Sequence, residues 1–345
     1  MIEKEISNKF KVLSVLAILL VVIIHSNNVI PIENDNYTFA TFNYNFQNLL
    51  TQGIARIAVP IFFIISGYYF FERINKNDFK TLAKKKIFTL VIPYIFWNFV
   101  VLSLYFFIDY SYLPKTNITN NITLLQYIKM ITIQPINGPL WFIRDLLFLM
   151  ILGPIINFVL KGKYIKEFMF ILFFLWILNL GEGTGQKAEP LFFFSLGGFI
   201  AFSNKKYLFI GNNTLKFLIF ILYFILLGIH TKYLNYYNYF EFVLLHKLII
   251  LLGIFTFWFL IDFLKTGKEK ILLLSKYSFL IYVIHYPLVY IIKEIMINLL
   301  GKYEYVNFIS FIITTPIIIL ISILFFYILK KYSPNFMNLI LGNRI

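Results

Sequence analysis

Long apolar blocks alternate with short polar stretches along the whole chain, and most blocks have the roughly 20 residues that a helix needs to cross a bilayer. Backbone groups in hydrocarbon must be hydrogen-bonded within the segment, so the blocks are predicted to be helices. No polar stretch exceeds about thirty residues or has an amphipathic pattern of its own, which leaves no room for a soluble domain. We therefore expect one all-α membrane domain over 1–345, with about ten spans. The blocks lie near 12–31, 48–71, 87–109, 139–160, 167–181, 190–204, 214–230, 240–264, 274–298 and 305–329.

The composition supports this class. Hydrophobic residues make up 60% of the 345 residues and charged residues 14%, whereas a soluble globular domain carries about 25% charged residues. Aromatic residues make up 20%, which suits lipid-facing helices with Tyr and Trp near the interfaces. There is no cysteine, so disulfide and thiolate chemistry are excluded. No cleavage site of small residues follows the first block, which predicts a retained first span and no signal peptide.

The basic residues test the span map independently, because Lys and Arg collect in cytoplasmic loops. With the N-terminus inside, 22 of the 31 basic residues fall in inner segments, six in outer segments and three, Arg56, Arg144 and Lys247, inside spans. Both termini and residues 73–86 are thus predicted to be cytoplasmic, and 32–47 and 110–137 to be outside. This asymmetry and anionic lipid account for the net charge of +15. We expect the lipid bilayer of a bacterial plasma (inner) membrane as the partner, and no nucleic acid.

Ionisable side chains inside a bilayer are costly and usually face a protein interior or a watery cavity. His25 follows Lys11 by fourteen residues, which at 1.5 Å per residue places it roughly 21 Å from the inner face, in the outer half. Arg56 and Arg144 are expected at the same depth. This convergence predicts a cavity open to the outer face. Asp109, Glu241, His246 and Lys247 also lie toward the outer ends of their spans.

Structural roles are the alternative for several of these groups. Adjacent side chains on a helix point about 100° apart, so Arg144 and Asp145 are expected to have separate partners, which structural ion pairs would supply. Near the span ends, snorkelling to the interface is the alternative for a charged side chain. This applies to His230, Glu241 and Lys247.

The histidines allow two interpretations of His25 and none that involves a metal. His25 is either a neutral imidazole hydrogen-bonded in the core or a general base near neutral pH. The four histidines are scattered, and no His-x-x-His or Glu-x-x-His pair occurs, so we expect no metal site.

Four segments together resemble one family. They are VVIIHSN at 21–27, RIAVPIFFIISGYYF at 56–70, GPLWFIRDLL at 138–147 and YSFLIYVIHYPLV at 277–289. In this order, on the first, second, fourth and ninth spans, they are similar to the acyltransferase 3 family of bacterial membrane acyltransferases that modify cell-surface sugars. The second-span motif is most similar to the branch with polysaccharide O-acetyltransferases, the intercellular-adhesin succinylation or export protein and the membrane half of vancomycin-resistance serine racemases.

The resemblance implies transfer of an acyl group, usually acetyl from acetyl-CoA as co-substrate with no bound cofactor, to a sugar hydroxyl at the outer face. It implies that His25 is catalytic and that Arg56 and Arg144 hold the reacting groups. A structural role is the alternative for Tyr282 and His285. The other residues that it implies at the substrate site are Asn27, Ser66, Trp141, Asp145, Tyr282 and His285.

On the cytoplasmic side, basic residues are candidates to hold the phosphates of CoA, and positive-inside topology is their alternative explanation. The family commonly has Arg eleven residues before the histidine, where this chain has Ser14. Lys11 lies one turn earlier, and we hypothesise that it partly compensates. The donor-side candidates are Lys11, Arg73, Lys84 and Lys85.

A transporter or flippase for a lipid-linked sugar is the competing interpretation, because such proteins also carry broken helices and charges near the midplane. The histidine of the first span and the Trp-x-x-Arg of the fourth favour the enzyme, since bond-making chemistry requires such groups and transport does not.

The topology predicts which loops a membrane-impermeant reagent reaches. A cysteine introduced at Lys80, in a chain without native cysteine, should stay unmodified in intact cells and react once the membrane is permeabilised. Modification of this position from outside intact cells would contradict the span map.

Overall fold

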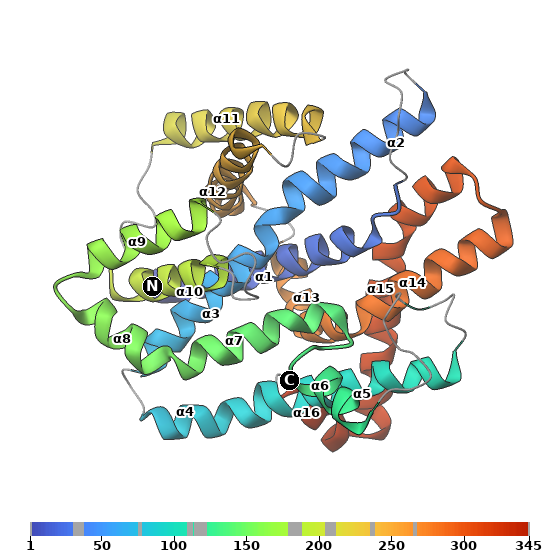
Figure 1. Ribbon diagram of the computed structural model, residues 1–345, viewed down its shortest axis with the longest axis horizontal. Helices are drawn as coiled ribbons and strands as arrows, with labels where there is room; N and C mark the ends of the chain where they lie inside the picture. The colour runs from blue at the N-terminus through green and yellow to red at the C-terminus, as the bar shows by residue number, and fades with distance from the viewer. Residues whose placement is uncertain are drawn as a thin grey trace. The chain divides into compact units, whose positions relative to one another are not determined.

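The computed structural model describes residues 2–29, 38–74, 78–108, 113, 123–178, 188–203, 212–234, 239–264 and 268–343. Every regular element in these ranges is helical, so the prediction of an all-helical, polytopic membrane protein is confirmed (Figure 1). Asp109, most of the predicted outer loops and the ends of several predicted spans lie outside the described residues. The α-helices are α1 (Ile2–Ser26), α2 (Phe39–Asn48), α3 (Ala58–Ile74), α4 (Phe79–Lys86), α5 (Ile92–Phe107), α6 (Leu124–Thr132), α7 (Trp141–Ile151), α8 (Gly153–Lys161), α9 (Ile165–Ile177), α10 (Ala188–Phe202), α11 (Asn213–Lys232), α12 (Phe240–Phe263), α13 (Lys268–Leu274), α14 (Ser278–Leu300), α15 (Glu304–Tyr332) and α16 (Pro334–Leu341).

Seven of the described helical segments are long and apolar enough to cross a membrane, and the bent pair formed by α7 and α8 makes up to eight. Each of the ten predicted blocks coincides with helix, but α9 and α10 have only 13 and 15 residues. That is shorter than the roughly 20 residues of an unbroken span. The described ranges therefore contain seven or eight candidate spans by length and composition.

Two predicted boundaries differ from the structure at polar residues. α1 begins at Ile2, ten residues before the predicted start at 12, and the second span begins at Phe39 instead of 48. The first ten residues of α1 include Lys and Glu, which are good helix formers, so this helix continues past the apolar block that first marks it. The second span also changes its winding, through a π-turn η1 (Leu49–Gly53) and a 3-10 turn η2 (Ile54–Ile57), before α3 begins.

The chain folds into two compact units, each discontinuous in sequence. Unit 1 contains Met1–Leu20, Asn48–Leu82 and Asp145–Ser275; unit 2 contains Val21–Gln47, Ala83–Arg144 and Lys276–Ile345. The organisation of 1–345 as one functional domain stays a prediction.

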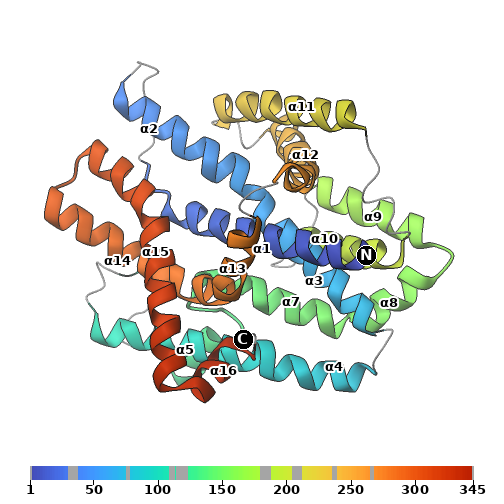
Figure 2. The same cartoon turned by 180° about the vertical axis from the view of Figure 1, so that it is seen from behind.

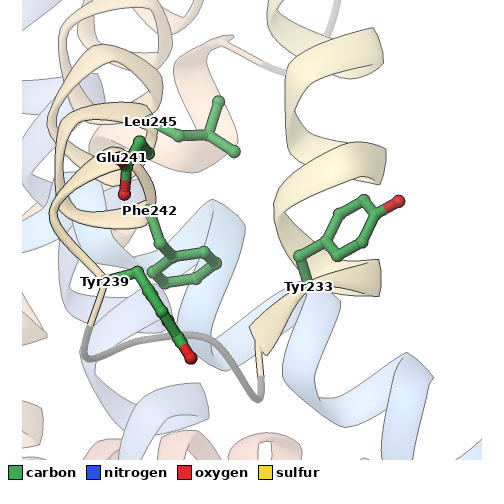
Figure 3. A pocket seen from close by; sticks show the side chains of 5 residues that line it. All are labelled: Tyr233, Tyr239, Glu241, Phe242 and Leu245. Atoms are coloured by element: carbon green, nitrogen blue, oxygen red, sulfur yellow. The ribbon is translucent and has the colours of Figure 1, made fainter.

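Unit 1 is built around the close approach of α3 and α10, which lie side by side in Figures 1 and 2. A Cβ on Gly67 would collide with the carbonyl oxygen of Phe194, and a Cβ on Gly197 would collide with that of Ile64. Small residues at such crossings let helix backbones meet, which favours association in lipid. α11 and α12 form a second pair in this unit, and between their connected ends lies a pocket of about 340 Å³ (Figure 3).

Unit 2 holds α5, α14, α15 and α16 together. α14 and α15 form an antiparallel pair whose turn uses Gly301 at φ 87°, a conformation that favours glycine. α16 packs on α5, where Trp97 Nε1 donates to the carbonyl oxygen of Ile340 at 3.0 Å. A row of buried amides adds polar links, because Gln47 Nε2 donates to both Asn28 and Asn43 at 2.8 Å.

Because α3 and α10 approach so closely, glycine-to-alanine substitution should affect stability differently at Gly197, which lies in this contact, and at Gly228, which does not. Gly197→Ala should lower the free energy of unfolding by about 1–3 kcal/mol, because the added methyl has no space. Gly228→Ala on α11, where a Cβ would meet nothing within 4 Å, should leave stability unchanged or raise it by up to about 1 kcal/mol. Thermal unfolding of the purified variants in detergent would measure both. Equal effects at the two positions would contradict the close crossing.

Candidate functional site

His25 lies in the last turn of α1, within unit 2, and is half-buried. Its ring faces α14, with the ring centroid 5.2 Å from that of His285 and 5.3 Å from that of Tyr286. The structure thus brings together the histidines of the first and ninth predicted spans, which are far apart in sequence.

The tautomer of His285 follows from its hydrogen bond. Its Nδ1 lies 2.7 Å from the carbonyl oxygen of Tyr282, and a carbonyl oxygen only accepts, so Nδ1 carries the hydrogen. Nε2 of the neutral ring then presents a lone pair. This atom is buried and has no hydrogen-bond partner among the described residues, and the side chain is 0% exposed. His285 is therefore a fixed, neutral acceptor beside His25.

The segment before α7 is fastened to the same part of α14. The Tyr282 hydroxyl donates to the carbonyl oxygen of Pro139 at 2.5 Å. Pro139 lies in a 3-10 turn, η5 (Gly138–Leu140). A Cβ on Gly138 would lie 3.0 Å from the ring of Tyr286, so this turn sits directly against the aromatic side chain. Tyr282 and Tyr286 therefore hold both the turn and the histidine pair.

Pro287 explains why an amide side chain is needed where the segment before α7 meets α14. A proline inside a helix has no N–H, so the carbonyl four residues earlier, that of Val283, loses its helical partner. Asn137 Nδ2 donates to this oxygen at 2.9 Å, while Asn137 N donates to Asn98 Oδ1 at 3.1 Å. Asn98 and Asn137 are both 0% exposed. The buried pair repairs the helix and links α5, the turn η5 and α14.

Arg144 occupies a different position in unit 2. Its Nη1 donates to the carbonyl oxygen of Ile133, just after α6, at 3.1 Å. A cation is favourable at a helix C-terminus, so this bond ties α7 to the end of α6. Trp141, the first residue of α7, and Asp145 are half-buried like Arg144. The boundary between the units falls between Arg144 and Asp145.

Arg56 belongs to unit 1, where the 3-10 turn η2 carries it. Its Nη2 donates to Gln52 Oε1, and its charge interacts with Glu189, His230 and His246. Ser66 is half-buried on α3 in the same unit.

The cations predicted for the donor side lie at exposed positions. Arg73 at the end of α3 lies over the ring of Tyr69, and Lys11, Lys84 and Lys85 are also exposed. The Ser14 hydroxyl donates to the carbonyl oxygen of Phe10 in its own helix at 2.8 Å.

In unit 1, the structure also buries a lysine that the sequence analysis did not single out. Lys9 is 1% exposed, pairs with Asp262 and lies 4.6 Å from the centre of the Trp258 ring. The available signal was a single polar residue at a position where the helix is otherwise apolar. The predicted cytoplasmic location of the basic residues already explained Lys9, so this signal was not used.

Sequence reasoning also missed Asn98, Asn137 and the contact of His230 with His246. A signal existed for the amides, because Pro287 inside an apolar block leaves a carbonyl that some donor must satisfy. Within the described ranges, no three His, Cys, Asp or Glu residues are grouped so that they could hold a metal ion.

Comparisons with known proteins give three findings. Residues 9–329 match the family model Acyl_transf_3, described as an acyltransferase domain. The chain is 31% identical over 157 residues to the succinoglycan biosynthesis protein ExoH of Rhizobium meliloti (strain 1021), a match that covers 43% of this chain and 41% of the relative. No solved structure matches the chain.

The contact between Asn137 and α14 predicts an energetic coupling to Pro287. Asn137→Ala should cost about 1–3 kcal/mol of unfolding free energy, because it leaves the buried Val283 carbonyl without a donor. With Pro287→Ala the helix regains its own N–H, so Asn137→Ala should cost less in that background. Unfolding of the two single variants and the double variant in detergent measures the coupling. An equal cost of Asn137→Ala in both backgrounds would contradict the repair of the helix by Asn137.

Proposed function

The chain belongs to the acyltransferase 3 family, and we propose that it is a membrane O-acyltransferase for a cell-surface polysaccharide or lipid-linked sugar. The acyl group, in our proposal acetyl from acetyl-CoA, ends on a sugar hydroxyl at the outer face. The family match over nearly the whole chain and the similarity to a protein named for succinoglycan biosynthesis support this proposal.

The single observation that carries the mechanism is the pairing of His25 with His285. A sugar hydroxyl is a weak nucleophile, so a base must take its proton as the oxygen attacks the thioester carbonyl carbon. His25 is half-buried and accessible, whereas His285 is fully buried. We therefore assign the proton transfer to His25 and the orientation of its ring to His285, whose hydrogen bond to Tyr282 fixes its own ring.

His25 takes up one proton in this reaction and releases it again, so it ends the reaction unchanged. The hydroxyl proton moves to its imidazole, the new C–O bond forms, the C–S bond breaks, and the departing CoA thiolate takes the proton back. The negative charge on the carbonyl oxygen during this step needs a cation or fixed donors nearby. Arg56 and Arg144 are our candidates for that role. Asn27, Ser66, Trp141, Asp145 and Tyr282 are our candidates for binding the substrates.

For the topology we propose about ten crossings, with α9 and α10 each serving as a short span. The basic asymmetry supports cytoplasmic termini in a bacterial plasma membrane. The exposed side chains of Arg73, Lys84 and Lys85 would then face the cytoplasm, where the phosphates of acetyl-CoA are available. Lys11 would contribute from the same side.

A transporter or flippase remains the second candidate, favoured by irregular helices. α7 and α8 meet at a bend of 59°, and η1 and η2 interrupt the second span with π and 3-10 turns. Discontinuous helices of this kind form midplane sites in transporters. Transport does not require a base, so the role of His25 separates the two functions.

His25→Ala should lower the rate of acyl transfer by about a hundredfold to ten-thousandfold, the usual loss when a general base is removed. The measurement is acceptor-dependent release of free CoA from acetyl-CoA by purified protein in liposomes, with the acylation of surface polymer as the assay in cells. Phe158→Ala is the matched control, because Phe158 is 81% exposed on α8. Wild-type rates in His25→Ala protein that is normally inserted would favour the transporter.

A further inference from the structure

Unit 1 contains a buried polar cluster around Arg56, and its two histidines, His230 and His246, have no role in the proposed acyl transfer. Here η1 contacts α11 and η2 contacts α12. His246 Nδ1 lies 3.0 Å from His230 Nε2, and the two rings are stacked with centroids 5.1 Å apart. We call Gln52, Arg56, His230 and His246 the Arg56 cluster.

The histidine pair leaves one buried nitrogen without a partner. In the bond between the two histidines, one ring donates a hydrogen and the other accepts it. This bond uses Nε2 of His230, so the second nitrogen of that ring, Nδ1, lies outside the bond. His230 is 1% exposed, and its Nδ1 has no hydrogen-bond partner among the described residues. If His246 donates, neutral His230 carries its hydrogen on Nδ1, as an unsatisfied donor. A buried unsatisfied group is costly, and binding an acceptor removes that cost.

Arg56 supplies a second such donor together with a permanent charge. Its Nη2 donates to the neutral side chain of Gln52, while Nε is buried with no hydrogen-bond partner in the described part of the chain. A guanidinium stays charged in proteins and offers donors in a planar fork that matches a carboxylate.

The nearby carboxylate is already engaged. Glu189 Oε2 lies 3.8 Å from Lys247 Nζ and accepts from Trp176 Nε1 at 3.0 Å. Glu189 interacts with Arg56 at longer range, but no described carboxylate forms an ion pair with Arg56 within 4.0 Å. With Lys247 paired to Glu189, the positive charge of Arg56 stays in a membrane-spanning unit. One surplus charge suits a monoanion, whereas a doubly charged phosphate would cost more to desolvate.

We propose that the Arg56 cluster binds a carboxylate group of a substrate, held by Arg56 Nε–H and His230 Nδ1–H. This inference rests on the proposed acyltransferase function, in which the carboxylate has two sources. It either ends an acyl group derived from a dicarboxylic acid, or it belongs to an acidic sugar of the acceptor. Binding selects the tautomer in which His246 donates to His230.

The pocket of unit 1 lies next to this cluster. The ring of Phe242 stacks on His230 with centroids 4.6 Å apart, and its side chain points from α12 into the pocket (Figure 3). The pocket therefore ends one aromatic ring away from the histidine pair. Its other walls are Tyr233, Tyr239, Glu241 and Leu245.

The first test compares charged ligands with neutral analogues on the unmodified full chain in detergent. Succinamate, the singly charged half-amide of succinic acid, is compared with succinamide as the acyl arm, and glucuronate is compared with glucose as the sugar arm, at constant ionic strength. In one arm the carboxylate should raise the thermal unfolding midpoint with a saturable concentration dependence, and its neutral analogue should not. The arm that responds identifies the source. Equal responses to the charged and neutral members of both pairs would overturn the proposal without any variant.

The second test places the binding at the Arg56 cluster. Arg56→Gln and His230→Phe should each weaken binding of the responding carboxylate by about tenfold or more, because a charge-assisted or buried hydrogen bond is lost. His230→Asn keeps an N–H near the Nδ1 position and should retain most of the affinity. Lys216→Gln is the control, since Lys216 is a cation of unit 1 that pairs with Asp262 at 3.5 Å. Unchanged affinity in Arg56→Gln would overturn the assignment.

These measurements separate the inference from the proposed function, because neither uses acyl transfer as its readout. Carboxylate binding that depends on Arg56, in a protein that never releases CoA in the presence of acceptors, would contradict the enzyme and support the site. Acyl transfer that depends on His25, with no discrimination between carboxylates and neutral analogues, would contradict the site alone.

Discussion

A carbonyl oxygen inside a bilayer has no water to bind, and the arrangement around His25 depends on one such oxygen. Pro287 removes the helical donor of the Val283 carbonyl, and Asn137 replaces it. The replacement fixes the turn at Gly138–Leu140 against α14, which brings the Pro139 carbonyl to the hydroxyl of Tyr282. Tyr282 in turn accepts from His285 through its own carbonyl. The bond that compensates for Pro287 thus places the turn before α7 against the same part of α14 that carries His285.

Charged side chains in unit 1 also need partners within the protein where water is excluded. Lys9 pairs with Asp262 and Lys247 with Glu189, and each lysine also lies against a tryptophan ring. The aromatic face adds attraction that is worth more where water is excluded. Buried ion pairs often contribute little net stability, since desolvation offsets the attraction. Arg56 differs from both lysines, because its hydrogen-bond partner is the neutral Gln52. This difference is the reason why we propose a binding role for Arg56 and a structural role for the two lysines.

The sequence predicted the helices and the presence of most spans, because hydropathy reports which segments lie in lipid. It singled out His25 from its depth in the first span, and resemblance to a family added the motif around His285; the roles of both histidines stay predictions. It also indicated that the blocks at 167–181 and 190–204 are short, as α9 and α10 are, but it did not predict that His230 meets His246. These two histidines are separated by 16 residues and lie on different helices, α11 and α12. Hydropathy does not specify which faces of two apolar helices meet, so tertiary contacts of this kind need the structure.

The contact of His25 with His285 in unit 2 and the Arg56 cluster in unit 1 use different kinds of group, and the difference fits their proposed tasks. A site that moves a proton needs a group that is stable in two protonation states, which is the property of an imidazole such as that of His25. A site that selects an anion needs a charge that does not change with the reaction, which is the property of the Arg56 guanidinium. Unit 2 contributes the first kind and unit 1 the second. We therefore expect substitutions of Arg56 or His230 to change which anions bind and to leave the contact of His25 with His285 in unit 2 intact.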